Sequence, residues 1–279
     1  MKTETSSASV ETLLHDPRLS LRLWRAGELE ADEGSIPTGH AALDAHLAGR
    51  GWPRGGLIEL LCDRAGIGEL RLLAPALSAL SAEPRWILWL NPPHIPYAPA
   101  LAAHGIDVCK VLLVHPRQHR DALWALEQAL RSGTCSAALA WLDERKLKGP
   151  EIRKLKLAAN EGKTFAMLFR PESASGHAST AELRIRLRSS ASVQDALSRN
   201  SVEIDIVKRR GGWPVTVRAE LPAPVPVTYA EHERELRTWR GQPSESATHR
   251  LDLERTRAQS GLVRTATSPR FDRSVVRLV

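Results

Sequence analysis

The residues best placed for chemistry lie in a glycine-punctuated segment at residues 55–73. An apolar run at residues 57–61 predicts a buried strand, Gly66 and Gly68 predict a turn, and the leucines that recur from Leu70 onward predict an amphipathic helix. A strand, a glycine turn and a helix are the parts of a phosphate-binding loop. In such a loop a lysine neutralises phosphate charge and a Ser or Thr hydroxyl holds Mg²⁺.

The residue types in this segment do not match that chemistry. With the pattern G-x-x-x-x-G-K-[ST] ending at Leu70, Asp63 falls at the first glycine, Gly68 at the second and Glu69 at the lysine. A carboxylate about 4 Å from a phosphate charge costs roughly 4 kcal/mol at an effective dielectric near 20. The segment with Asp63, Gly66, Gly68, Glu69 and Leu70 is therefore a degenerate loop. We expect no cofactor, no metal and no catalytic residue, and predict that the protein is not an enzyme.

Composition narrows the class of protein. The chain has 279 residues, a formal charge of +7 and three cysteines, and its pI is near 9.7, which favours anionic partners. The cysteines lie in or beside apolar segments without C-x-x-C spacing, so neither a zinc site nor a disulfide framework is indicated. The N-terminus lacks the apolar region of a signal peptide, and apolar runs such as residues 86–90 are too short to span a bilayer. We predict a cytoplasmic protein.

The elements that position the glycine turn alternate along the chain. Apolar runs and helical periodicity predict a parallel sheet covered by helices on both faces. A helix over residues 38–47, with Thr38 as its cap, precedes them. The predicted strands are 57–61, 86–90, 110–114, 137–142 and 164–169, and the predicted helices are 69–81, 95–104, 119–132 and 150–161.

The pattern changes after residue 170. Residues 171–181 are small and polar, as in a loop, and alternating strands follow at 183–187, 202–208 and 215–220, with the last two forming an antiparallel hairpin. The proline-rich, arginine-rich remainder predicts a largely disordered tail. We divide the chain into an N-terminal arm (1–34), a core (35–222) and this tail (223–279).

Basic residues and one aspartate are the remaining candidates. Asp143 follows the strand 137–142, where an aspartate either helps to hold magnesium or caps the next helix. Clustered cations track phosphates and make binding salt-dependent, although such clusters are also common on solvated faces. The candidate contacts with DNA or a partner are Lys146, Lys148, Arg153, Lys208, Arg209 and Arg210.

The order of these parts resembles the RecA core. The resemblance rests on S-I-P-T-G at residues 35–39, Leu43-Asp44, and G-W-P-R-G-G-L-I-E at residues 51–59, and it extends to about residue 221. It implies a RecA-like α/β fold with a mostly parallel sheet and a C-terminal antiparallel hairpin. It also places the water-activating carboxylate at Pro93, which cannot act as a base. Tyr97 falls at a position that can stack on adenine, although packing is the more common role of such a tyrosine.

Within that superfamily, the tryptophan of GWPRG and the degenerate loop are most similar to the ImuA family. These SulA-like, RecA-related proteins are accessory factors of SOS mutagenesis. The resemblance implies a non-catalytic accessory protein of damage-induced translesion DNA synthesis. Its implied partners are an ImuB-type polymerase-like protein, an error-prone α-subunit-type DNA polymerase, RecA, and weakly bound, non-specific DNA, with no membrane. Cytoplasmic localisation would then include the nucleoid upon induction.

Two other functions compete with this one. The first is a SulA-like inhibitor of cell division that binds the division tubulin; such chains are shorter than this one. The second is a true RecA-type ATPase in which Arg64 or Arg71 supplies the missing cation. Glu69, Leu70 and Pro93 together disfavour the ATPase.

Overall fold

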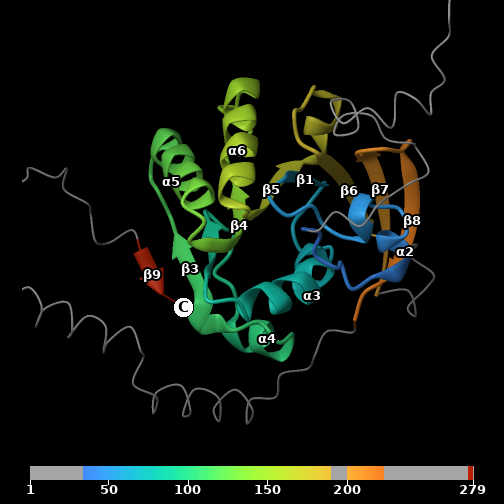
Figure 1. Cartoon of the computed structure of the whole chain (residues 1–279), viewed down its shortest axis with the longest axis horizontal. Helices are drawn as coiled ribbons and strands as arrows, with labels where there is room; N and C mark the ends of the chain where they lie inside the picture. The colour runs from blue at the N-terminus through green and yellow to red at the C-terminus, as the bar shows by residue number, and fades with distance from the viewer. Residues whose placement is uncertain (1–33, 190–199, 223–275, 279) are drawn as a thin grey trace, which may run out of the picture.

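The structure is a computed structural model that describes residues 34–189, 200–222 and 276–278 (Figure 1). The predicted arm (1–34), except Gly34, and the predicted tail (223–279), except its last strand, lie outside the described residues. The domain boundaries drawn from the sequence therefore stay predictions.

The described residues form one nine-stranded sheet in the order β8-β7-β6-β1-β5-β4-β2-β3-β9. Six neighbouring strands, from β6 to β3, run parallel, and β7, β8 and β9 join antiparallel. The strands are β1 (Leu57–Cys62), β2 (Trp86–Leu90), β3 (Val111–Val114), β4 (Cys135–Trp141), β5 (Phe165–Pro171), β6 (Leu183–Ser189), β7 (Ser201–Lys208), β8 (Val215–Glu220) and β9 (Val276–Leu278).

Helices cover both faces of the parallel part of the sheet. Helices α3 and α4 lie on one face and α5 and α6 on the other, and each face has its own buried core (Figure 1). Because β1, β2, β4 and β5 are covered on both sides, their sequences are mostly apolar, and their exceptions Glu59, Ser136 and Arg170 are themselves buried. The helices are α2 (Ala41–Asp44), α3 (Glu69–Ser81), α4 (Ala98–Ala103), α5 (His119–Arg131) and α6 (Gly149–Gly162).

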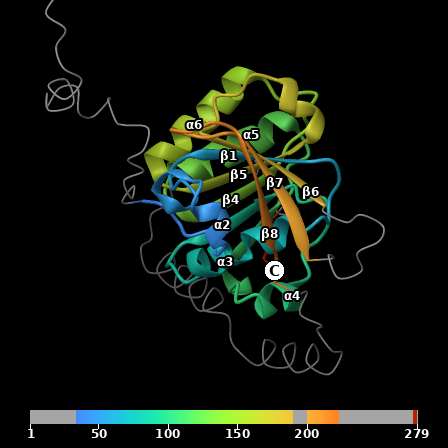
Figure 2. The same ribbon diagram turned by 90° about the vertical axis from the view of Figure 1, so that its right-hand side faces the viewer.

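Strands β6, β7 and β8 extend the sheet beyond β1, with α2 beside β8 (Figure 2). On these strands, residues facing the core alternate with polar residues, as expected for antiparallel strands with one solvated face. Strand β2 follows α3 in the sequence, but it does not pair with β1. It lies three places away from β1 in the sheet.

The predicted mixed α/β class is confirmed, and two local predictions need correction. Thr38 does not cap a ten-residue helix: α2 has four residues, its N-cap is His40, and the Thr38 hydroxyl accepts the His40 backbone N–H at 3.0 Å. The loop at 171–181 contains a short 3₁₀ turn at Glu172–Gly176. Within residues 223–279, the described part is β9, which pairs antiparallel with the sheet edge at β3; the predicted disorder of the rest lies outside the described residues.

Candidate functional site

The glycine turn between β1 and α3 holds a carboxylate in the position that a bound anion would need. The Glu69 side chain accepts the backbone N–H of Gly66 at 2.7 Å and that of Gly68 at 3.1 Å. Backbone N–H groups at the start of a helix attract phosphate, but here the protein's own glutamate uses them. Glu69 therefore opposes phosphate binding in two ways, by its charge and by occupying the donors.

Residues that follow β8, near the end of the predicted core in the sequence, contact the same turn. Gly68 has a φ of +111°, and a Cβ there would lie 2.6 Å from Cδ1 of Leu221. Arg71, a residue considered as a replacement cation, donates to the Pro222 carbonyl at 2.9 Å and to the Asn200 side chain at 2.8 Å. Arg71 is thus held by the chain that leaves β8, and it does not face the turn.

The thiol at the end of β1 is kept neutral by its surroundings. Burial of Cys62, together with the carboxylates of Glu69 and Asp63, raises the pKa of this thiol to about 12. Since the thiolate is the nucleophilic form, Cys62 is unsuited to covalent chemistry near neutral pH.

This environment predicts the order in which the cysteines react. With iodoacetamide at pH 8, Cys109, which is exposed, should be alkylated first, and Cys62 should remain unmodified over the same time in the folded protein. Peptide mass spectrometry at successive times measures both sites. Equal alkylation rates at Cys62 and Cys109 would contradict the raised pKa of Cys62.

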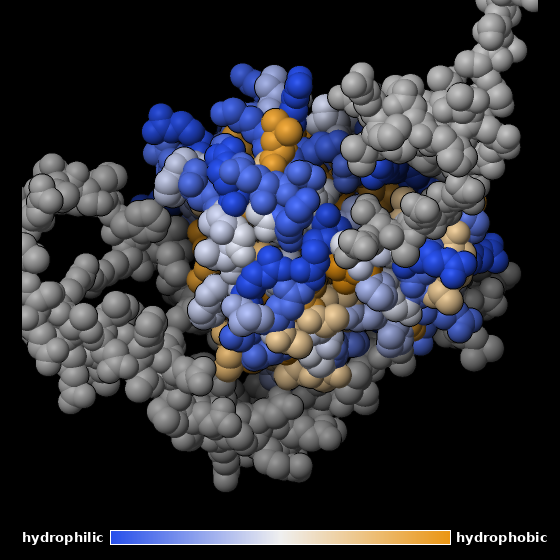
Figure 3. Space-filling view, in the orientation of Figure 1, coloured by the Kyte–Doolittle hydropathy of each residue, from blue (hydrophilic) through white to orange (hydrophobic). Residues whose placement is uncertain are grey.

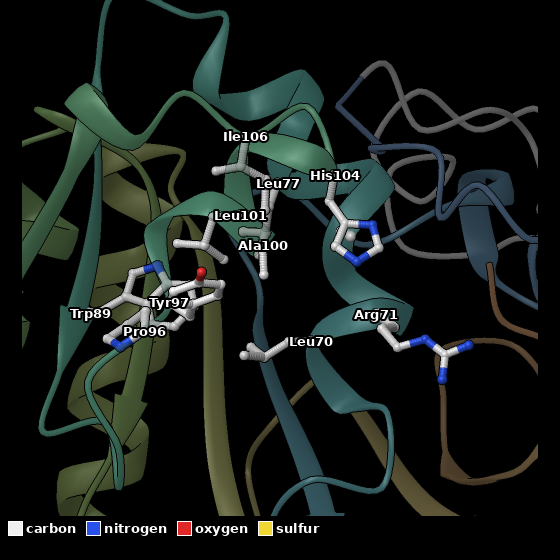
Figure 4. Close-up of a pocket in the computed structure, with 11 residues that line it drawn as sticks. Leu70, Arg71, Leu77, Trp89, Pro96, Tyr97, Ala100, Leu101, His104 and Ile106 are labelled. Carbon is white, nitrogen blue, oxygen red and sulfur yellow. The ribbon is translucent and has the colours of Figure 1, made fainter. Parts of the chain in front are cut away.

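An apolar cavity of about 310 Å³ lies between α3 and α4. Leu70 and Leu77 of α3, Trp89 of β2, and Tyr97 and Leu101 near α4 line it, whereas the Arg71 side chain points away from this apolar group (Figure 4). Tyr97, for which packing is favoured over stacking, lines this cavity and is 52% exposed. The cavity adjoins the glycine turn, but the one guanidinium that lines it is held by Pro222.

A smaller polar pocket of about 190 Å³ lies at the carboxyl ends of β2, β3 and β4, where Asn91, His119, Asp143 and Lys146 are among its lining residues. The Asp143 carboxylate lies 3.1 Å from Lys146, and its pKa is lowered by the hydrogen bond from Lys146 and by the backbone N–H of Arg145. Asp143 thus makes local contacts after β4, as a capping residue does. No group of three or more metal-ligating side chains occurs among the described residues.

The structure separates the basic residues singled out in the sequence. Lys208 donates to the Ser179 carbonyl at 2.9 Å, and burial together with nearby Lys156 and Arg184 lowers its pKa. Arg209 donates to the carbonyls of Trp213, at 3.0 Å, and His46. Lys208 therefore contacts the loop after β5, and Arg209 bonds within the β7–β8 turn and to the chain after α2.

Arg210 lies in the β7–β8 turn, and the remaining three predicted basic residues lie around the start of α6. Lys146 forms an ion pair with Asp143, and Lys148 and Arg153 are exposed. Sequence reasoning missed the roles of Glu69 and Leu221. A glutamate in the first turn of a helix, one residue after a glycine, was the available signal for Glu69.

The fold and this site define a mixed α/β protein whose phosphate-loop position is filled by its own side chains. Comparison with known proteins then identifies the family. The family model for cell division inhibitor SulA matches residues 58–166. "Cell division inhibitor SulA" of Pectobacterium carotovorum subsp. carotovorum is 30% identical over 145 residues, which are 52% of this chain and 86% of that protein. The chain belongs to the SulA family.

Other relatives carry the same name. The protein from Serratia proteamaculans is 32% identical over 137 residues, 47% of this chain and 80% of that protein. The protein from Edwardsiella piscicida is 38% identical over 101 residues, 36% of this chain and 59% of that protein. The crystal structure of SulA from Pseudomonas aeruginosa is 28% identical and covers 41% of this chain and 97% of that one, with a TM-score of 0.34.

These matches correct the main functional prediction. The relatives are named for the inhibition of cell division, so the predicted role in translesion DNA synthesis is wrong. The predicted partners are wrong with it: the ImuB-type protein, the α-subunit-type polymerase, RecA and weakly bound DNA. The SulA-like alternative is the one that the relatives favour.

Proposed function

We propose that the protein is a SulA-like inhibitor of cell division that acts by binding the division tubulin. The observation that carries this proposal is the match to relatives named as division inhibitors, which covers most of the length of several of them. The matched family region, residues 58–166, runs from β1 into β5 and contains the turn, both pockets and helices α3 to α6.

Controlled expression in a rod-shaped bacterium tests the proposal. Induction should block septation and give filamentous cells without loss of chromosome segregation. In parallel, the purified protein should bind purified division tubulin and reduce its GTP-dependent polymerisation, measured by light scattering. Normal division together with unchanged polymerisation at an excess of the protein would overturn the proposal.

We also propose that this inhibition needs no catalysis by the protein. The support is the turn itself, where Glu69 accepts two backbone N–H groups and Leu70 replaces the magnesium-binding hydroxyl. Pro93 lies after β2, at the position expected for a water-activating carboxylate. Inhibition by stoichiometric binding is the mode that such a site favours.

A nucleotide experiment checks this prediction. The wild-type protein should show neither ATP binding by calorimetry nor phosphate release above background. The double variant Glu69→Lys with Leu70→Thr restores the cation and the hydroxyl, and should still give no turnover, because Pro93 leaves no base. Turnover in the wild type that is lost in Asp143→Ala would contradict the non-catalytic proposal.

Two further assignments belong to the proposal. A RecA-like core is supported by the strand order. The strand before the glycine turn is β1, the strand before Asp143 is β4, and β5 lies between them in the sheet. Cytoplasmic localisation is supported by the proposed target, since the division tubulin is itself cytoplasmic. Among the described residues, the structure has no helix with the length and apolar character needed to cross a membrane. Membership of the ImuA group within the family stays a prediction.

A further inference from the structure

A buried ion network starts in the middle of β1. Glu59 has no exposed surface, and Arg170 of β5 and Arg184 of β6 are each 5% exposed. Glu59 Oε1 accepts from Arg170 Nη1 at 2.8 Å, and Oε2 accepts from Arg184 Nε at 2.7 Å. Buried charges are costly unless they are paired and hydrogen-bonded, and here one carboxylate pairs with two guanidinium groups.

Arg170 connects this network to the loop after β4. It donates to both carboxylate oxygens of Glu144, with its Nε at 2.9 Å from Oε2. Burial lowers the pKa of Arg170, but the carboxylates of Glu144 and Glu59 outweigh burial and leave that pKa above its ordinary value. Glu144 Oε1 also lies 3.6 Å from Nδ1 of His177 in the loop after β5. Glu144 therefore joins the two loops.

The buried Arg184 side chain hydrogen-bonds to the backbone of the loop after β5. Its guanidinium donates to the carbonyls of Ala174 at 2.8 Å and His177 at 3.1 Å. Ser179 donates its hydroxyl to Glu59, and the Ser179 carbonyl accepts from Lys208. Residues 171–181 are thus held at several points along their length, although their small polar side chains would favour a mobile loop.

The outer side of this region has an excess of positive charge. Each carboxylate of the two loops lies within 4 Å of a cationic group, as the pairs Asp143–Lys146, Glu144–Arg170 and Glu172–Arg186 show. Arg153 and Lys154 follow the first loop on α6; both are exposed and have no ion pair within the described part of the chain. Hydrophilic residues dominate the visible surface over α5 and α6 (Figure 3).

We propose that loops 143–148 and 171–181, together with the first half of α6, form a preorganised docking surface for an acidic region of a protein partner. This inference rests on the proposed function, under which the partner is the division tubulin. The loops lie at the carboxyl ends of β4 and β5, the edge where open α/β sheets bind their ligands. A surface that is already ordered loses less conformational entropy on binding, and unpaired cations favour an acidic partner.

The same contacts disfavour nucleic acid as the ligand. Lys146 is paired with Asp143, and Lys208 is bonded to the Ser179 carbonyl. Neither loop contains Phe, Tyr or Trp, and stacking on such side chains is a main source of single-strand affinity.

The first experiment tests the rigidity of the loops by hydrogen exchange of backbone amides. Loop 171–181 should be protected in the wild-type protein. Ser179→Ala should increase exchange in this loop by about tenfold, as expected when a local hydrogen bond is lost, without changing exchange in β2 and β4. Ser132→Ala is the matched control, because Ser132 hydrogen-bonds in an exposed turn before β4. Unprotected amides in the wild-type loop would overturn the preorganisation.

The second experiment tests the surface with two charge reversals on one helix. Arg153 is in the second turn of α6, next to the loops, whereas Lys163 follows the last turn at the opposite edge of the sheet. Arg153→Glu should raise the Kd for purified division tubulin by about tenfold or more, with most of the effect lost at high salt, and Lys163→Glu should leave it within about twofold.

The outcomes separate the two proposals. Binding that is equally affected, or unaffected, by both reversals overturns the docking surface and leaves the proposed function in place. No binding by the wild-type protein overturns the proposed function and, with it, this partner. Arg153→Glu weakening the binding of a single-stranded oligonucleotide, but not of the tubulin, would show that the surface binds nucleic acid.

Discussion

Gly162→Ala is expected to destabilise the protein severely. A Cβ at this position, the last residue of α6, would lie 1.9 Å from the carbonyl oxygen of Leu130 and 2.9 Å from the backbone nitrogen of Gly133. Both neighbours are backbone atoms at the end of α5, so no side-chain rotation relieves the clash. Overpacking of a core usually costs about 1–3 kcal/mol, and we expect at least the upper end of that range in the free energy of unfolding measured with urea.

Gly149→Ala provides the matched control on the same helix. Gly149 is the first residue of α6, and a Cβ there would have no heavy atom within 4 Å. Replacing a helical glycine with alanine usually stabilises by about 0.4–1 kcal/mol when the space is free. Equal free energies of unfolding for Gly162→Ala and Gly149→Ala would show that the backbones of α5 and α6 do not approach each other as closely as described.

Glu59→Leu is expected to have a comparable effect for an electrostatic reason. The change leaves Arg170 and Arg184 buried, without the carboxylate that lies between them. Breaking a buried ion pair by removing one partner typically costs about 3–5 kcal/mol, because the remaining charge is left unpaired. Urea unfolding followed by circular dichroism measures this cost at neutral pH.

An exposed ion pair provides the matched control for replacing a paired glutamate with leucine. Glu161 pairs with Arg131 at 2.9 Å, and its side chain is 62% exposed. Glu161→Leu should change the free energy of unfolding by less than about 1 kcal/mol. Similar losses for Glu59→Leu and Glu161→Leu would mean that the network around Glu59 is solvated and does not stabilise the two loops.

Much of the fold was accessible to sequence reasoning because it depends on local periodicity. The apolar runs at residues 57–61 and 86–90 and the helical spacing at 69–81 correspond closely to β1, β2 and α3. Thr38 was misassigned because a short polar residue before a helix suits several turns, and its hydroxyl here bonds within a tight turn around His40.

The degeneracy of the glycine turn was likewise visible in the residue types alone, since a carboxylate cannot replace a lysine. The partner was not visible. Resemblance to the RecA core concerns the residues that build a sheet and a turn, and these do not specify which protein a surface binds. The relatives named as division inhibitors corrected that assignment.

By itself, therefore, the sequence determined the α/β class, most of the strands and helices, and the absence of a lysine and a hydroxyl in the glycine turn. Only the tertiary structure decided that Glu69 occupies the turn's N–H groups, that Leu221 covers Gly68, and that residues 276–278 pair with β3. It also decided that Glu59 meets Arg170 and Arg184, which are 111 and 125 residues away in the chain. The physical reason is that periodicity reports which face of an element is buried, whereas hydrogen bonds between distant side chains depend on strand order and register, which neighbouring residues do not encode.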